Sequence, residues 1–184
     1  MSQEDEKWVH QVRKGSKKAF DKLVRKYAPL IFHLLYDMTG NYEDAEDLTQ
    51  ETFLRAFVNL SGYRGEAKFS TWLYRIAYNI GIDFRRKERK ISRVDLDPQD
   101  EKTSLRWFDE KGFKGYTGEE EAIESALKKL TQPQRMTVIL NYYHGFRMRE
   151  IGEILGCSEG SVRTHMFRAL RRLRRELRDY SPKA

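Results

Sequence analysis

Residues 148–177 read MREIGEILGCSEGSVRTHMFRALRRLRREL, and this stretch decides the fold of the C-terminal part of the chain. Apolar residues in Ile151–Leu155 have the spacing of a short helix, and Gly156-Cys157 makes a tight turn. Ser158 is placed to cap a second helix, whose apolar residues recur at helical spacing up to Leu177. The pattern predicts a helix-turn-helix.

The second of these helices carries residue types that suit duplex DNA. Seven arginines lie between positions 163 and 178. Arginine bonds bidentately to guanine edges or phosphates, and threonine and phenylalanine contact thymine methyl groups. The alternative is a basic, solvated helix in an α-helical bundle, but turn chemistry and arginine placement together favour DNA binding. Near the N-terminal end of this helix lie Arg163, Thr164, His165, Phe167 and Arg168. The later arginines suit phosphates or solvent: Arg171, Arg172, Arg174 and Arg175.

Composition bounds the function of the 184-residue chain. Its net charge of +7, with 34 % charged residues, favours a polyanionic partner such as nucleic acid or an anionic membrane surface. No apolar run is long enough to span a membrane, and the N-terminus lacks a signal-peptide pattern, so we expect a cytoplasmic protein. The single cysteine and the scattered histidines indicate no disulfide, metal site or cofactor.

Upstream, the sequence predicts more helices. One should run from Ser16, a capping residue, to Gly40, which can end it, and another from Asn41 to Leu60 with Phe57 in its buried stripe. A further helix should begin at Ser70 or Thr71 and reach about residue 90. Its inferred core face leaves out Trp72, Arg75, Asn79 and Arg86 on one stripe and Tyr74 with Tyr78 on another.

Between these blocks the composition changes. Residues 93–118 are acidic, contain glycines and a proline, and show no helical period, although they include four aromatic residues at 107, 108, 113 and 116. We interpret this segment as a flexible linker, part of which docks on another surface. The predicted fold is therefore all-α, with small helical domains at 1–92 and 119–184.

Three blocks taken together resemble a known family. DAEDLTQETFLRAF (44–57), KFSTWLYRIAYN (68–79) and the helix-turn-helix, in this order, resemble the extracytoplasmic-function (group IV) sigma factors of the sigma-70 family, which consist of regions 2 and 4. The resemblance covers roughly residues 5–92 and 118–178. It implies a dissociable RNA polymerase subunit with no catalytic activity, no cofactor and, often, an anti-sigma factor as partner.

The resemblance also assigns roles to residues. It implies that the clamp of the largest catalytic polymerase subunit binds Asp47, Gln50 and Glu51, and that region 4 meets the flap of the second-largest subunit. It implies that the minus-ten promoter element is melted and its single strand is held, a task that needs rings, hydrogen-bonding groups and cations. The minus-ten candidates are Arg64, Ala67, Lys68, Phe69, Ser70, Trp72, Arg75, Ile76, Asn79, Arg85 and Arg86.

Among these, Asn79 is the first candidate for reading a captured base, whereas Trp72, Tyr74 and Tyr78 are as well explained by packing. For the minus-thirty-five element, the resemblance implies Asn141, Ser161, Arg163, Thr164, Phe167, Arg168 and Arg171. His165 stands where the family often has a basic residue, which puts a phosphate contact there in doubt.

Two other function classes remain. A conventional helix-turn-helix regulator would bind duplex DNA without polymerase and would usually dimerise. An enzyme acting on nucleic acid has no positive support, because the sequence lacks a phosphate-binding glycine loop and zinc-ligand spacing.

Overall fold

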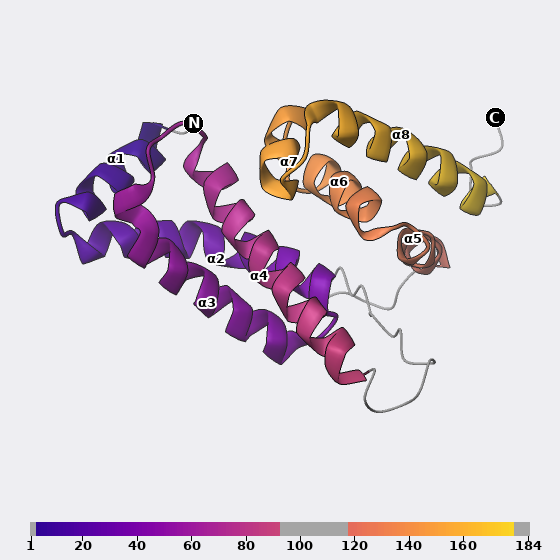
Figure 1. Ribbon diagram of the computed structural model, residues 1–184, viewed down its shortest axis with the longest axis horizontal. Helices are drawn as coiled ribbons and strands as arrows, with labels where there is room; N and C mark the ends of the chain where they lie inside the picture. The colour runs from indigo at the N-terminus through magenta and orange to yellow at the C-terminus, as the bar shows by residue number, and fades with distance from the viewer. Residues whose placement is uncertain (1–2, 93–117, 179–184) are drawn as a thin grey trace. The chain divides into compact units, whose positions relative to one another are not determined.

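The computed structural model describes residues 3–92 and 118–178, which fall in two compact units (Figure 1). Within those ranges all regular elements are helical, which confirms the all-α prediction. The predicted linker lies outside the described residues except for its last position, Gly118. Among the described helices, none combines the length and the apolar character that crossing a membrane requires.

The N-terminal unit contains helices α1 (Gln3–Arg13), α2 (Lys17–Thr39), α3 (Tyr42–Asn59) and α4 (Phe69–Ser92), with a short 3-10 turn at Leu60–Gly62. Helices α2, α3 and α4 pack against one another, and α1 packs on α2 (Figure 1).

The sequence signals for the ends of α2 and α3 are confirmed. The Ser16 hydroxyl accepts a hydrogen bond from the Ala19 amide, and the Asn41 side chain accepts one from the Asp44 amide at 3.1 Å. Between these helices Gly40 adopts a left-handed conformation with φ of 71°. These local interactions end one helix and begin the next.

A glycine sets how closely α4 approaches α2. A Cβ atom built on Gly81 would lie 2.5 Å from the terminal methyl of Met38, so the two helices meet at this point. Leu23, Leu34 and Leu73 are fully buried around the contact layer of the bundle. The core of this unit therefore lies among α2, α3 and α4 and combines aliphatic side chains with buried aromatic ones.

The C-terminal unit contains α5 (Gly118–Lys128), α6 (Gln132–Tyr142), α7 (Met148–Leu155) and α8 (Glu159–Glu176). Helices α7 and α8 form the predicted helix-turn-helix. Gly156 takes the left-handed conformation at the turn, and the Ser158 hydroxyl caps α8 by accepting from the Ser161 amide at 3.1 Å. A small core holds the unit together, made of Leu127, Leu130, Val138, Met166 and Ala169.

Several details of the helix predictions were wrong. Helix α4 begins at Phe69, so Ser70 and Thr71 lie in its first turn and do not cap it. Tyr74 and Tyr78 are buried, because α4 packs on both α2 and α3 and therefore buries a wider arc than one stripe. Phe57, expected in the core, is 47 % exposed and lies edge-on to Phe20.

Candidate nucleic-acid and polymerase interfaces

A cluster of aromatic rings lies where the loop before α4 meets that helix. Tyr63, Phe69 and Trp72 are in mutual contact, with ring centroids 5.1 Å apart for Tyr63 and Trp72 and 5.7 Å apart for Phe69 and Trp72. The Tyr63 hydroxyl donates to the Ala67 carbonyl at 2.7 Å and so fixes the loop. Phe69 is only 1 % exposed, whereas Trp72 is half-buried above it.

Polar groups line the exposed side of α4 beside this cluster. Trp72, Arg75 and Asn79 are separated by three and four residues, so they share one face of the helix, and both polar side chains are exposed. The face joins a ring to a cation and an amide, the three group types that an unpaired strand requires. Of the other minus-ten candidates, the exposed ones are Arg64 and Arg86, and the half-buried ones are Ala67, Lys68, Ser70, Ile76 and Arg85.

The sequence reasoning missed the residues that support the aromatic cluster from below. Tyr27 on α2 lies 5.7 Å from Phe69, and its hydroxyl donates to the buried carboxylate of Asp5 on α1 at 2.8 Å. Burial, helped by Asp5, raises the pKa of Tyr27, while a hydrogen bond from Ser70 acts in the opposite direction. Asp5 stands in an acidic N-terminal stretch, and no pattern there distinguishes it from its solvated neighbours.

Helix α8 displays its candidate residues openly. Arg163, Thr164, Phe167 and Arg168 are exposed, and Phe167 has 68 % of its surface accessible. Arg163 pairs with Glu159 one turn earlier, at 2.6 Å. Ser161 and His165 are half-buried, and Arg171 is exposed. The helix thus presents cations, a hydroxyl and a ring together near its N-terminal end.

Asn141 is engaged in the fold itself. Its side-chain amide donates to the Phe146 carbonyl at 2.9 Å and holds the turn between α6 and α7. The neighbouring Tyr142 and Tyr143 are exposed. A DNA contact from Asn141 would therefore compete with, or add to, a structural hydrogen bond.

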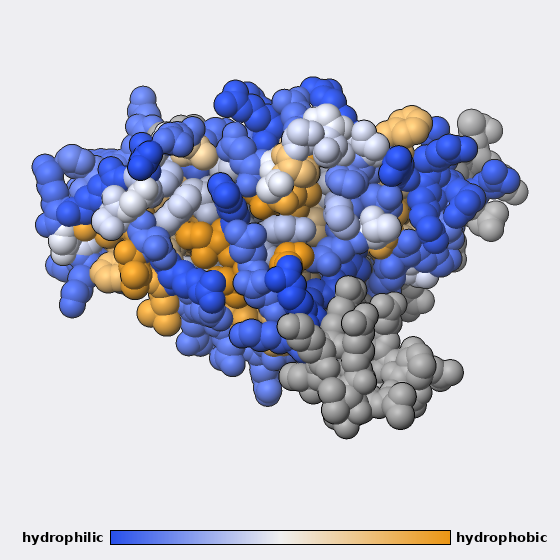
Figure 2. Space-filling view, in the orientation of Figure 1, coloured by the Kyte–Doolittle hydropathy of each residue, from blue (hydrophilic) through white to orange (hydrophobic). Residues whose placement is uncertain are grey.

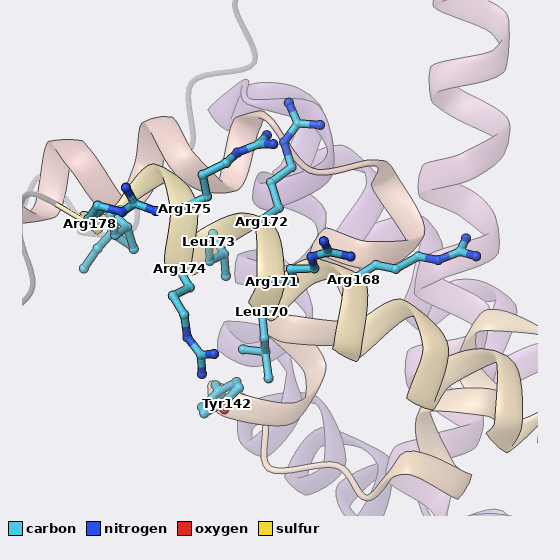
Figure 3. Close-up of a pocket in the computed structure, with 11 residues that line it drawn as sticks. Tyr142, Arg168, Leu170, Arg171, Arg172, Leu173, Arg174, Arg175 and Arg178 are labelled. Carbon is cyan, nitrogen blue, oxygen red and sulfur yellow. The ribbon is translucent and has the colours of Figure 1, made fainter.

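An open groove of about 1060 Å³ runs along the C-terminal half of α8. Figure 3 shows arginines spreading from this helix around Leu170, with Tyr142 beneath. Leu170 belongs to the apolar residues that recur along this helix, yet it is 38 % exposed, and Tyr142 and Ile123 add further apolar surface. The arginines that line the groove are Arg168, Arg171, Arg172, Arg174, Arg175 and Arg178.

Helix α3 presents a second kind of surface. Asp47 and Gln50 are exposed, and Glu51 is partly exposed and pairs with Arg55. The same face continues one and two turns later with Leu54 and Val58, which are 67 % and 74 % exposed. In Figure 2 hydrophobic colouring gathers at this end of α3, at the left of the view.

Sequence reasoning found the polar part of this α3 face and missed its apolar part, although the spacing 47, 50, 51, 54 and 58 could have revealed it. The exposed apolar continuation makes this face a candidate for protein binding. In the part of the chain that the structure describes, no three His, Cys, Asp or Glu side chains are grouped to hold a metal ion.

Comparisons with known proteins agree with both units. The family model for sigma-70 region 2 matches residues 23–91, and that for sigma-70 region 4 matches residues 120–173. The ECF RNA polymerase sigma factor SigW of Bacillus subtilis (strain 168) is 36 % identical over 181 residues, which are 94 % of this chain and 96 % of that protein.

Two solved structures share the fold. One is CnrH in complex with the cytosolic domain of CnrY, with a TM-score of 0.69 and 22 % identity over 97 % of this chain and 99 % of CnrH. The other is the sigma factor RpoE from Bartonella quintana, in complex with the anti-sigma factor NepR, with a TM-score of 0.65 and 24 % identity. That match covers 88 % of this chain and 98 % of the Bartonella chain.

Proposed function

Because the chain belongs to the ECF group of the sigma-70 family, whose members are non-enzymatic transcription initiation factors, we propose that it reads its promoters in two ways. The N-terminal unit binds the minus-ten element as a melted single strand, and α8 binds the minus-thirty-five element as a duplex. The protein acts in the cytoplasm as a subunit of RNA polymerase.

The observation that carries the minus-ten proposal is the shared face of Trp72, Arg75 and Asn79. An unpaired base stacks on the half-buried Trp72 ring, and the Asn79 amide hydrogen-bonds to a base edge. Arg75 neutralises a phosphate of the DNA strand. Phe69 supports Trp72 from below. Arg85 and Arg86, farther along α4, contact phosphates of the duplex and add affinity that falls as salt rises.

The minus-thirty-five proposal rests on the open N-terminal part of α8. A recognition helix reads the major groove with side chains from this part, and Arg163, Thr164, Phe167 and Arg168 all extend into solvent there. Arg163 is already oriented by Glu159. We assign Arg168 to a guanine edge or a phosphate and Phe167 to a thymine methyl group.

The polymerase contact is proposed for the face of α3. Asp47, Gln50 and Glu51 supply polar groups to the clamp, and Leu54 with Val58 supplies the apolar area that surface polar groups alone lack. Burial of two exposed aliphatic side chains contributes roughly 1.5–3 kcal/mol each. The apolar part of this face therefore contributes much of the binding free energy for core polymerase.

The groove along α8 is proposed as a docking site for a helix with an apolar stripe and acidic flanks. Leu170 and Tyr142 match the stripe, and the surrounding arginines match the acids. The family resemblance implies such partners in the flap of the second-largest polymerase subunit and in an anti-sigma factor. The Bartonella sigma factor named above was solved with an anti-sigma factor.

The test of the proposed function is transcription from a duplex library with a randomised upstream region. Bacterial core polymerase is incubated with and without this protein, and the transcripts are sequenced. We expect discrete transcripts only when both are present, with two enriched upstream elements. Tight binding to particular duplexes without polymerase, and no transcripts, would instead indicate a conventional regulator.

Variants in the same assay separate the two elements. Asn79→Ala should relax the base preference within the minus-ten element and leave the minus-thirty-five preference intact, because only the former is read by the α4 amide. Arg168→Ala should do the reverse, at a cost of about 1–3 kcal/mol for one lost base contact. Parallel loss at both elements in either variant would contradict the assignment.

A further inference from the structure

Helix α1 lies outside the residues that the region 2 family model matches, which begin at 23, yet it reaches the loop and first turn that hold the minus-ten candidates by two routes. The first route starts at Asp5, which is 4 % exposed. Its carboxylate accepts hydrogen bonds from Lys26 at 2.7 Å and from the Tyr27 hydroxyl at 2.8 Å. A carboxylate buried in this way is costly unless both partners stay in place.

Tyr27 passes this restraint to the start of α4. Its ring lies 5.7 Å from that of Phe69, the first residue of α4. Phe69 and Ser70 are adjacent minus-ten candidates, and Phe69 supports Trp72. A single phenol therefore links a buried acid on α1 to the residues beneath the proposed base-binding face.

The second route runs from Arg13 at the end of α1. Its guanidinium lies over the Tyr63 ring, 5.8 Å from the centroid, and the Tyr63 hydroxyl fixes the Ala67 carbonyl in the loop before α4. Between the two routes is a cavity of about 360 Å³, lined by four residues of α1 and by Tyr63, Gly65 and Phe69. The contacts between α1 and the loop therefore lie on either side of this cavity.

We propose that α1 positions the minus-ten reading loop, with Asp5 acting as a positioning residue through Tyr27 and Phe69. The inference rests on the proposed function, since it concerns the same α4 face. In this arrangement Asp5 touches no DNA. It fixes the tilt of the first turn of α4, and so the place of the Trp72 ring against which the unpaired base stacks.

Tyr27→Phe is the test variant, because it removes only the hydroxyl and keeps the ring against Phe69. Lys26→Met is the matched control, because it removes the other hydrogen bond to the same Asp5 carboxylate and leaves the one from the Tyr27 hydroxyl in place. The Lys26 ammonium also lies over the rings of Trp8 and Tyr27, 5.7 Å and 5.3 Å from their centroids. Both variants weaken the hold on Asp5. Only Tyr27→Phe breaks the hydrogen bond between Asp5 and the residue that packs on Phe69.

The readout uses two forked DNA probes whose minus-ten element is single-stranded. One probe carries the minus-ten sequence that the wild-type protein selects, and in the other the captured base is replaced. The measured quantity is the ratio of the holoenzyme's affinities for the two probes. A purely structural defect lowers both affinities and leaves the ratio unchanged. We expect Tyr27→Phe to lower the ratio by about three- to tenfold, which is part of the free energy of one hydrogen bond to a charged group, and Lys26→Met to leave it within about twofold.

Affinity for core polymerase, measured by titration, should stay at the wild-type value in both variants. Equal ratios in Tyr27→Phe and Lys26→Met would overturn the inference, as would a loss in Tyr27→Phe that follows a loss of polymerase binding. If the wild-type holoenzyme itself fails to prefer the selected strand, the proposed function falls and the inference falls with it. If the wild type prefers the selected strand but the variants do not give the expected ratios, the proposed function stands and the inference about α1 fails.

Asp5→Asn provides a second and independent measurement. It keeps the shape of the side chain and removes its charge, so it weakens the hydrogen bond from Tyr27 without deleting the phenol. Combined with Tyr27→Phe, it should add little further loss in the ratio, because both changes act on one contact. Additive losses would show that Asp5 acts on the loop by some route other than Tyr27, and would overturn the proposed one.

Discussion

The two units hold their aromatic rings in opposite ways. Phe69 in the N-terminal unit is 1 % exposed beneath Trp72, whereas Phe167 on α8 is 68 % exposed. A duplex presents its base edges within a groove, so the side chains that read it must project from the protein before they meet it. An unpaired base instead requires a ring face that is held still from behind.

This difference separates two kinds of binding surface. The side chains of the α8 surface already project into solvent without bound DNA, and this leaves the apolar Phe167 ring exposed to water. The α4 surface depends on a support of packed rings, from Trp72 through Phe69 to Tyr27 and on to Asp5. Under the proposed function, reading a duplex therefore depends on one helix, and holding a single strand depends on contacts among α1, α2 and α4.

The largest expected effect tests this difference directly. Phe69→Ala should destabilise the N-terminal unit by about 3–5 kcal/mol, because it leaves a cavity in packed surroundings. The matched Phe167→Ala should change stability by no more than about 0.5 kcal/mol, because its ring faces solvent. Denaturant unfolding, followed by hydrogen exchange of peptides from each unit, measures both.

A small stability change for Phe69→Ala would show that the ring cluster supports nothing, and the contrast between the units would fail. Loss of minus-thirty-five binding in Phe167→Ala at unchanged stability would strengthen it. Reduced stability in Phe167→Ala would mean that the ring packs on the unit.

A second comparison uses one glycine from each unit. Added Cβ atoms would lie 2.5 Å from a Met38 side-chain atom at Gly81 and 2.7 Å from the Cys157 carbonyl oxygen at Gly152. The methionine side chain can move aside, but the carbonyl belongs to the turn between α7 and α8 and cannot. Gly152→Ala should therefore impose strain of about 1–3 kcal/mol.

Gly81→Ala should be close to neutral, since repacking of Met38 is offset by a gain of about 1 kcal/mol in helix propensity. Unfolding of each unit by hydrogen exchange is again the measurement. If Gly81→Ala proves the more damaging variant, the α2–α4 contact is more rigid than the helix-turn-helix turn.

Much of the fold follows from local sequence signals. Ser16, Gly40, Asn41 and Ser158 each act on atoms within a few residues, and for this reason the ends of helices that they set could be predicted. The burial of Tyr74 could not, because it depends on α4 packing against two helices at once. A period along one helix does not reveal how many neighbours that helix has.

The candidate sites divide in the same way. Helical spacing sufficed to place Trp72, Arg75 and Asn79 on one face. The support provided by Asp5 and Tyr27 could not be found from spacing, because those residues are separated in sequence from Ser70 by the whole of α3. Asn141 shows a different limit: its hydrogen bond to the Phe146 carbonyl could not be found from spacing, and its DNA contact stays a prediction of the resemblance.

The smallest expected effect concerns how α8 is tied to the rest of its unit. Glu176 at the end of α8 accepts a hydrogen bond from Lys129 at 2.7 Å, which lowers the pKa of its carboxyl below the ordinary value of 4.5. A carboxyl with a lowered pKa in the folded state contributes stability above its ordinary pKa and loses it as the pH falls through the folded value. Glu176→Gln should therefore lower the thermal midpoint of the C-terminal unit slightly at pH 7 and not at all below the folded-state pKa. Calorimetry across that range checks the sign: a difference that persists at low pH would mean that the side chain acts by packing and that its charge contributes nothing.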